Sequence, residues 1–117
     1  PEALLPIAGS YDALNKVLTI LQFDYNGEKE YVNSMWEIQK YPYKGDALNA
    51  YNDGKNEAGV QLGQFYELES SSPAIALKQN QTLKHTQRTY HFVGNENQLN
   101  EICKMLLGVA LNEINFD

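Results

Sequence analysis

Apolar and polar residues alternate along much of the chain, a pattern that is typical of β-strands. Residues 16–25 are apolar on both alternating faces, which predicts a strand that is covered on both sides. Residues 1–15 contain two prolines, a Gly-Ser pair and no sustained period. We therefore expect this segment to be an irregular lead-in to the first strand.

A hairpin signal follows the first expected strand. Asn26 and Gly27 both tolerate positive φ, so we expect residues 30–39 to return as an antiparallel strand. An exposed tryptophan is a good stacking surface for a sugar ring, but the alternation favours Trp36 as a core residue. The expected apolar face of this strand consists of Val32, Trp36 and Ile38.

Further short strands are indicated later in the chain, separated by turn residues. An Asn-containing tight turn at residues 79–81 would join two of them into a hairpin. The expected strands are residues 47–51, 65–69, 74–78, 82–92 and, in the tail, 110–116.

The period changes after Gly94, where apolar residues recur every three or four positions and predict an amphipathic helix. Asn95 with Gln98 fits a capping pair, and Gly108 is placed to end the helix. Cys103 lies in the apolar stripe, so we interpret it as a small buried hydrophobe. The stripe consists of Leu99, Ile102, Cys103, Leu106 and Val109.

These elements predict a mainly β fold, an antiparallel β-sandwich with one C-terminal α-helix. The 117 residues would form a single domain over 1–117. The chain begins with Pro1 instead of Met, so we expect a processed product or an excised piece.

Composition narrows the range of partners. The net charge is −6 and the basic residues are scattered, so we do not expect nucleic acid as a partner. No apolar run approaches the roughly 20 residues that a membrane span needs. Cys103 is the only cysteine, which excludes an intrachain disulfide and leaves the redox compartment undetermined. We expect no metal site and no cofactor.

Two carboxylates share one face of the strand at residues 65–69. Glu67 and Glu69 have backbone positions about 6.6 to 6.8 Å apart on a regular strand. The carboxyl pairs of glycosidases lie roughly 5 to 9.5 Å apart, so the spacing is permitted. However, neighbours on one strand point the same way, and the simpler interpretation is a solvated strand face.

The polar, glycine-containing segment at residues 51–64 is the second candidate, because long loops in compact folds often carry function. Asn52, Asp53 and Glu57 offer oxygen ligands without EF-hand spacing, and the simpler interpretation is a turn with solvated carboxylates. With Tyr51 from the same segment, they are our candidate ligand-binding residues.

The two histidines, His85 and His91, lie six residues apart on the strand expected at 82–92, hence on one face but about 20 Å apart. They cannot share a metal ion there. His85 joins the candidate ligand-binding residues, although a half-exposed strand histidine needs no such role.

Residues 72–92, SPAIALKQNQTLKHTQRTYHF, resemble the C-terminal signature of galactose mutarotase (aldose 1-epimerase)-like proteins. Residues 31–54 are similar to uncharacterised proteins of Bacteroides-type gut bacteria. The resemblance of residues 72–92 to the mutarotase-like signature is carried by Pro73, Leu77, Lys78, Thr82, His85, Thr86, Tyr90 and Phe92.

The resemblance implies the C-terminal part of a mutarotase-like supersandwich, a carbohydrate partner, and a periplasmic or exported location. Gln79-Asn80-Gln81 replaces the usual Pro-Gly-Glu turn. In the epimerases a catalytic glutamate precedes the proline. In this chain only Glu67 or Glu69 could occupy that position, and the residues on either side do not match those of the epimerases. The epimerases' general-acid histidine has no counterpart before Trp36.

Three hypotheses follow. In the first, the chain is a non-catalytic carbohydrate-binding module of a bacterial glycan-utilisation protein. In the second, it is a fragment of a carbohydrate-active enzyme, an epimerase or glycoside hydrolase, with Glu67 or Glu69 as general base. In the third, it is a structural piece that forms a homodimer through open sheet edges.

Overall fold

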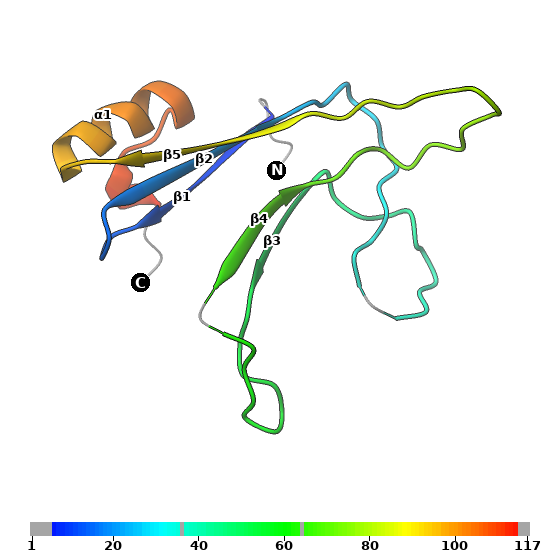
Figure 1. Ribbon diagram of the computed structural model, residues 1–117, viewed down its shortest axis with the longest axis horizontal. Coiled ribbons are helices and arrows are strands. Elements are labelled where there is room, and N and C mark those ends of the chain that lie inside the picture. Colours follow the sequence, from blue (N-terminus) through cyan, green and yellow to red (C-terminus); the bar gives the residue numbers. More distant parts are fainter. Residues whose placement is uncertain (1–5, 36, 64, 115–117) are drawn as a thin grey trace. The chain divides into compact units, whose positions relative to one another are not determined.

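The structure, a computed structural model, describes residues 6–35, 37–63 and 65–114 (Figure 1). Within these residues the fold is mainly β, with two antiparallel sheets and one α-helix, as the sequence predicts. The elements are β1 (Ile7–Asp12), β2 (Val17–Phe23), β3 (Leu48–Asn52), β4 (Tyr66–Ser70), β5 (Gln87–Val93), α1 (Glu96–Leu107) and a 3₁₀-helix, η1 (Leu111–Glu113).

The chain divides into two compact units, and we describe each by itself. The first unit comprises residues Pro1–Asp24 and Thr86–Asp117, and the second comprises residues Tyr25–His85. The first contains the three-stranded sheet and the helix, and the second contains the two-stranded sheet.

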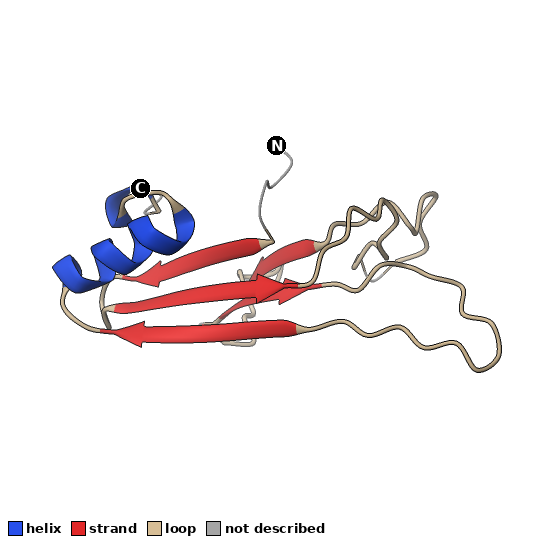
Figure 2. Cartoon of the chain, turned by 90° about the horizontal axis from the view of Figure 1, so that it is seen from above, coloured by secondary structure: helices blue, strands red, loops and turns tan. Residues whose placement is uncertain are grey.

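In the first unit, the strands lie in the order β1-β2-β5 and both pairs are antiparallel. Figure 2 shows α1 beside one end of this sheet. Leu18 and Ile20 of β2 pack with Leu99 and Cys103 of α1 to form the core. Thr19 and Leu21, which alternate with them, are buried as well, so the prediction of a strand covered on both sides is confirmed.

The expectation of an irregular lead-in is wrong for β1. Ile7 and Tyr11 lie on one face of this strand and pack against the core. These apolar contacts stabilise a strand although the composition of the segment favours turns. Gly9 lies between them on the same face, where the Leu107 side chain of α1 occupies the space that a Cβ would need. Asn15 bonds back to both carboxylate oxygens of Asp12, at 3.0 and 2.8 Å, and closes the turn to β2.

The returning strand expected at residues 30–39 is not formed. Gly27 has positive φ as expected, but the backbone of Tyr31 bonds to Tyr43 and Gly45 in place of a second long strand. Ile38 is fully exposed and Val32 is more than half exposed, so the predicted apolar face is wrong at both positions. Trp36 lies outside the described residues.

The hairpin expected around residues 79–81 is formed only in part. Asn80 adopts the left-handed conformation, with φ of 67°, and the backbone N–H of Gln81 donates to the Lys78 carbonyl. The regular strand β5 begins at Gln87, however, and residues 71–86 contain no strand. His85 therefore lies before β5 and not on it.

The helix is formed with the predicted caps, but Val109, which we expected in its apolar stripe, lies beyond Gly108 and is exposed. The Asn95 side chain accepts from the backbone of Gln98, the Gln98 side chain accepts from the backbone of Asn95, and Gly108 ends the helix in the left-handed conformation. Cys103 is fully buried, and this burial raises the pKa of its thiol. Of the strand expected at residues 110–116, the described residues form η1 instead, and the Leu111 N–H donates to the Asn100 side chain of α1. Residues 115 and 116 lie outside the described residues. No helix in the described parts of the chain could cross a membrane.

Candidate functional site

The candidate site lies in the second unit, on the antiparallel pair β3–β4. The register places Tyr51 opposite Glu67 and Asn49 opposite Glu69. Directly opposed residues of an antiparallel pair project from the same face, and residues two apart share it too. Phe65, one residue before β4, extends this face. We call the five residues Asn49, Tyr51, Phe65, Glu67 and Glu69 the acidic aromatic face.

Two aromatic rings lie together on this face. The ring centroids of Tyr51 and Phe65 are 6.2 Å apart, with 42° between the ring planes. This separation is in the range of favourable aromatic pairs. Tyr51 is 48% exposed and Phe65 is 41% exposed, so each ring keeps a substantial surface open to solvent. The pair thus forms a tilted apolar platform outside a hydrophobic core.

Asp53 holds this ring pair in place through hydrogen bonds. One of its carboxylate oxygens accepts the Tyr51 hydroxyl at 3.1 Å, and the other accepts the Gly63 N–H at 2.9 Å. Its backbone N–H donates to the Phe65 carbonyl, and its carbonyl accepts from the Gln61 side chain. Asp53 is buried, and its carboxylate and backbone together connect the two ends of the loop from 53 to 65.

These contacts shift two pKa values. The hydrogen bond from Gly63 lowers the pKa of Asp53, burial opposes this, and the Tyr51 hydroxyl lowers it further. The pKa of Tyr51 is raised, first by its hydrogen bond to Asp53 and then by burial and by the charges of Asp53 and Glu67. Tyr51 therefore keeps its phenolic proton, and its donor is committed to Asp53.

The remainder of the loop is held by Asn56. Its side-chain oxygen accepts from the backbone of Ala58 and Val60, at 3.1 and 2.9 Å. Glu57 and Lys55, on either side, are exposed. The expectation of an Asn-Asp-Gly turn with solvated carboxylates thus fits Glu57 but not Asp53.

Glu67 and Glu69 lie on one strand and one face, as the sequence predicts. Both are exposed. Across the strand pair Glu67 meets a tyrosine and Glu69 meets an asparagine, so neither faces a second carboxylate there. The pair can accept hydrogen bonds from a ligand lying along the strand, but it does not flank one from two sides.

The other two expected ligand-binding residues lie elsewhere in the second unit. Asn52 pairs with Tyr66 on the opposite face of β3–β4. The His85 ring nitrogen Nε2 lies 2.9 Å from the Ser70 hydroxyl, also on that face. The structure therefore brings Tyr51, Glu67, Glu69 and the supporting Asp53 together, and it separates Asn52, Glu57 and His85 from them.

Sequence reasoning missed Phe65 and Asn49. The alternation places Phe65 on the same strand face as Glu67 and Glu69, but it gives no sign that the ring pairs with Tyr51. Asn49 is half-buried, and its side-chain nitrogen lies 3.2 Å from the Ser71 hydroxyl. Its position opposite Glu69 depends on the β3–β4 register, which the sequence does not specify. No group of three metal-ligating side chains occurs among the described residues.

The fold and this face define a mainly β protein with an exposed aromatic and acidic strand surface. A family model described as a family of unknown function, DUF6786, matches residues 1–116, so the chain belongs to this family. No curated protein matches the chain. No solved structure matches it either.

Proposed function

We propose that this protein binds carbohydrate through the acidic aromatic face and acts as a non-catalytic module. The observation that carries the proposal is the Tyr51–Phe65 ring pair, exposed and held in place, with Glu67 directly across the strand from Tyr51. Exposed aromatic surface is costly in water unless a partner covers it, and the C–H face of a sugar ring is a suitable cover.

The polar groups around the rings suit a polyhydroxylated ligand. Glu67 and Glu69 supply carboxylate oxygens that accept hydrogen bonds from hydroxyls, and charge-assisted bonds of this kind are the stronger ones. Because the Tyr51 hydroxyl donates to Asp53, its ring is held in one orientation before any ligand arrives. Such preorganisation reduces the entropic cost of binding.

We further propose that the chain is a C-terminal part of a mutarotase-like sandwich in an exported protein of bacterial glycan utilisation. The left-handed Asn80 turn and the aromatic end of β5 support this relationship. An experimental structure of the chain within its natural full-length protein tests it: the proposal requires the two sheets to pack face to face, and sheets packed otherwise would contradict it.

The binding proposal is tested by screening neutral and acidic oligosaccharides and measuring affinity for the best one by calorimetry. We expect Tyr51→Ala and Phe65→Ala each to weaken binding by about tenfold or more, which corresponds to about 1.4 kcal/mol. The matched control is Tyr66→Ala, which removes a ring of similar exposure, 50%, from the opposite face. Equal losses in all three variants, or no saturable binding to any glycan, would refute the proposal.

The enzyme-fragment hypothesis makes a different prediction with the same protein. If Glu67 or Glu69 is a general base, the chain should catalyse mutarotation or glycoside hydrolysis, and Glu67→Gln or Glu69→Gln should abolish turnover while sugar binding persists. Saturable binding without turnover favours the module instead.

A further inference from the structure

The first unit presents an open sheet edge at β5. This strand pairs with β2 on one side, and no other described strand pairs with it. Six of its seven residues are exposed, and only Phe92 is half-buried. An unpaired strand edge of this kind offers a row of backbone donors and acceptors to another strand.

The ladder shows which backbone groups face outward. The Asp24 N–H donates to the Thr86 carbonyl at 3.0 Å. Asp24 and Thr86 follow directly on the last β2–β5 pair, Phe23 and Gln87, so they form a hydrogen-bonded pair of the ladder. Hydrogen-bonded and non-bonded pairs alternate along an antiparallel ladder. Tyr90 therefore directs its backbone groups to β2, whereas Thr89, His91 and Val93 direct theirs to the open edge.

This edge has little of the usual protection. Edge strands are commonly guarded by charged side chains, proline, a bulge or a covering element, but β5 carries a single charged residue, Arg88, no proline, and a regular register throughout. The opposite edge, β1, differs because all its residues are half-buried and Leu107 of α1 packs over Gly9. The edge of β5 is thus the more accessible of the two.

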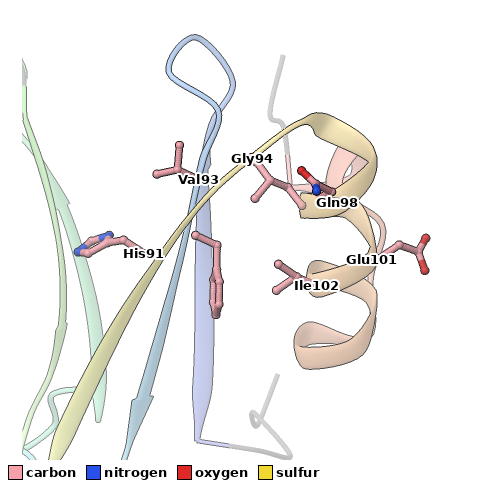
Figure 3. A pocket seen from close by; sticks show the side chains of 8 residues that line it. His91, Val93, Gly94, Gln98, Glu101 and Ile102 are labelled. Carbon is pink, nitrogen blue, oxygen red and sulfur yellow. The ribbon is translucent and has the colours of Figure 1, made fainter.

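A groove of about 700 Å³ runs between β5 and α1. Figure 3 shows Ile102 on the side of α1 toward the strand, Glu101 on the opposite side of the helix, and His91 on the far side of the sheet. Phe92 and Ile102 give the groove apolar walls, while the Glu101 carboxylate lies 3.8 Å from the Lys104 ammonium. The groove therefore offers apolar surface to a strand that is added beside β5.

We propose that a second copy of this chain adds its β5 to this edge, antiparallel, with the two Tyr90 residues facing each other across a two-fold axis. In this register Thr89 of each copy lies opposite His91 of the other, and both have outward backbone groups, so they exchange hydrogen bonds. Arg88 of each copy lies opposite Phe92 of the other. The two three-stranded sheets become one continuous sheet.

The strand is complementary to itself in this register. Arg88 is the only charged residue of β5, and in this register it lies opposite the apolar Phe92 of the other copy and not beside a second arginine. Tyr90 and Phe92 already stack, with centroids 6.4 Å apart and 16° between the planes. Tyr90 is 41% exposed, and the other copy's Tyr90 would extend this stack.

A disulfide trap tests the register. Two residues facing each other in a non-hydrogen-bonded antiparallel pair have Cα atoms about 4.5 Å apart, which a disulfide can bridge. Under mild oxidation, Tyr90→Cys should give a covalent dimer in high yield. The native Cys103 is fully buried and does not compete.

Val93→Cys is the matched control. Val93 is 76% exposed, more than Tyr90, but in the proposed register its two copies lie six positions apart, about 20 Å. We expect at least tenfold slower cross-linking than for Tyr90→Cys, and a concentration-dependent dimer of the unmodified chain in sedimentation equilibrium. A monomer at all concentrations, or equal cross-linking of both variants, overturns the proposal. Strand addition by another protein alone would leave the isolated chain monomeric and counts against it.

Discussion

At the scale of single residues, Asp53 is the polar group on which the candidate site depends. Its carboxylate holds the Tyr51 hydroxyl and the Gly63 N–H at the same time. Its folded-state pKa is lowered below the ordinary 3.8, chiefly by the Gly63 hydrogen bond. A group with a lowered folded-state pKa stabilises the fold above its unfolded pKa, and this contribution is lost as the pH falls through the folded value.

We therefore predict that Asp53→Asn destabilises the protein at pH 7 and that the difference from the wild type narrows below about pH 4. Urea denaturation of both proteins at pH 7, 5 and 3 measures the two free energies of unfolding. Because Asn retains the shape but not the charge, a difference that is constant from pH 7 to pH 3 would contradict the role of the ionised carboxylate.

Gly45 is a second residue at which the structure gives a specific reason for the amino acid present, because a side chain would not fit there. A Cβ at this position would overlap the backbone carbonyl of Val32, and backbone atoms cannot move aside as the end of a side chain can. The Gly45 N–H also donates to the Tyr31 carbonyl at 2.9 Å, at the bridge between Tyr31 and Lys44.

We expect Gly45→Ala to cost about 1–3 kcal/mol of stability, the usual range for forced backbone shifts. Gly54→Ala is the control, since no atom lies within 4 Å of its Cβ position and its φ is not in the left-handed region. Thermal unfolding followed by circular dichroism compares the two. Similar melting temperatures for both variants would mean that the close approach at Gly45 is readily relieved.

At the scale of elements, the existence and the caps of α1 were predictable, and much of the β structure was not. The helix is specified by local signals: a capping pair at Asn95 and Gln98, a period of three to four, and Gly108 at the end. The strand expected at residues 30–39 had a local signal too, but the backbone of Tyr31 is hydrogen-bonded to the backbones of Tyr43 and Gly45 instead. Strand pairing depends on distant segments, so alternation alone does not establish it.

Because the helix depends on its capping box, we predict that Asn95→Ala lowers stability by about 1 kcal/mol. Asn97→Ala, at an exposed position inside the same helix, should be neutral or slightly stabilising, since alanine has the higher helix propensity. Chemical denaturation of the two variants measures the difference. Equal effects would show that the side chain of Asn95 contributes no capping.

At the scale of the whole molecule, the sequence predicted the mainly β class but not the division into two units. The first unit combines residues 86–114 with residues before 25, a pairing of distant segments that β2 and β5 create. The candidate site shows the same limit. Glu67, Glu69 and Tyr51 were identified from the sequence, but their common face depends on the β3–β4 register.

The described residues of the second unit form no apolar core, and this has a consequence for the site. Tyr31 is the one buried hydrophobic residue among the described residues of that unit, so Tyr51 and Phe65 are held by the Asp53 hydrogen bonds and not by tight packing. The orientation of the rings is therefore sensitive to single polar changes, and the Asp53→Asn variant should weaken glycan binding as well as stability.

The central claim is that glycan binds on the acidic aromatic face, and an NMR titration with the best-binding oligosaccharide tests it most directly. Aromatic carbon–proton correlations report each ring separately. We predict saturable shift changes for Tyr51 and Phe65, with backbone changes at Glu67 and Glu69, while Tyr66 on the opposite face stays unchanged. Changes centred on Tyr66 or on the first unit, with Tyr51 and Phe65 unaffected, would contradict the account.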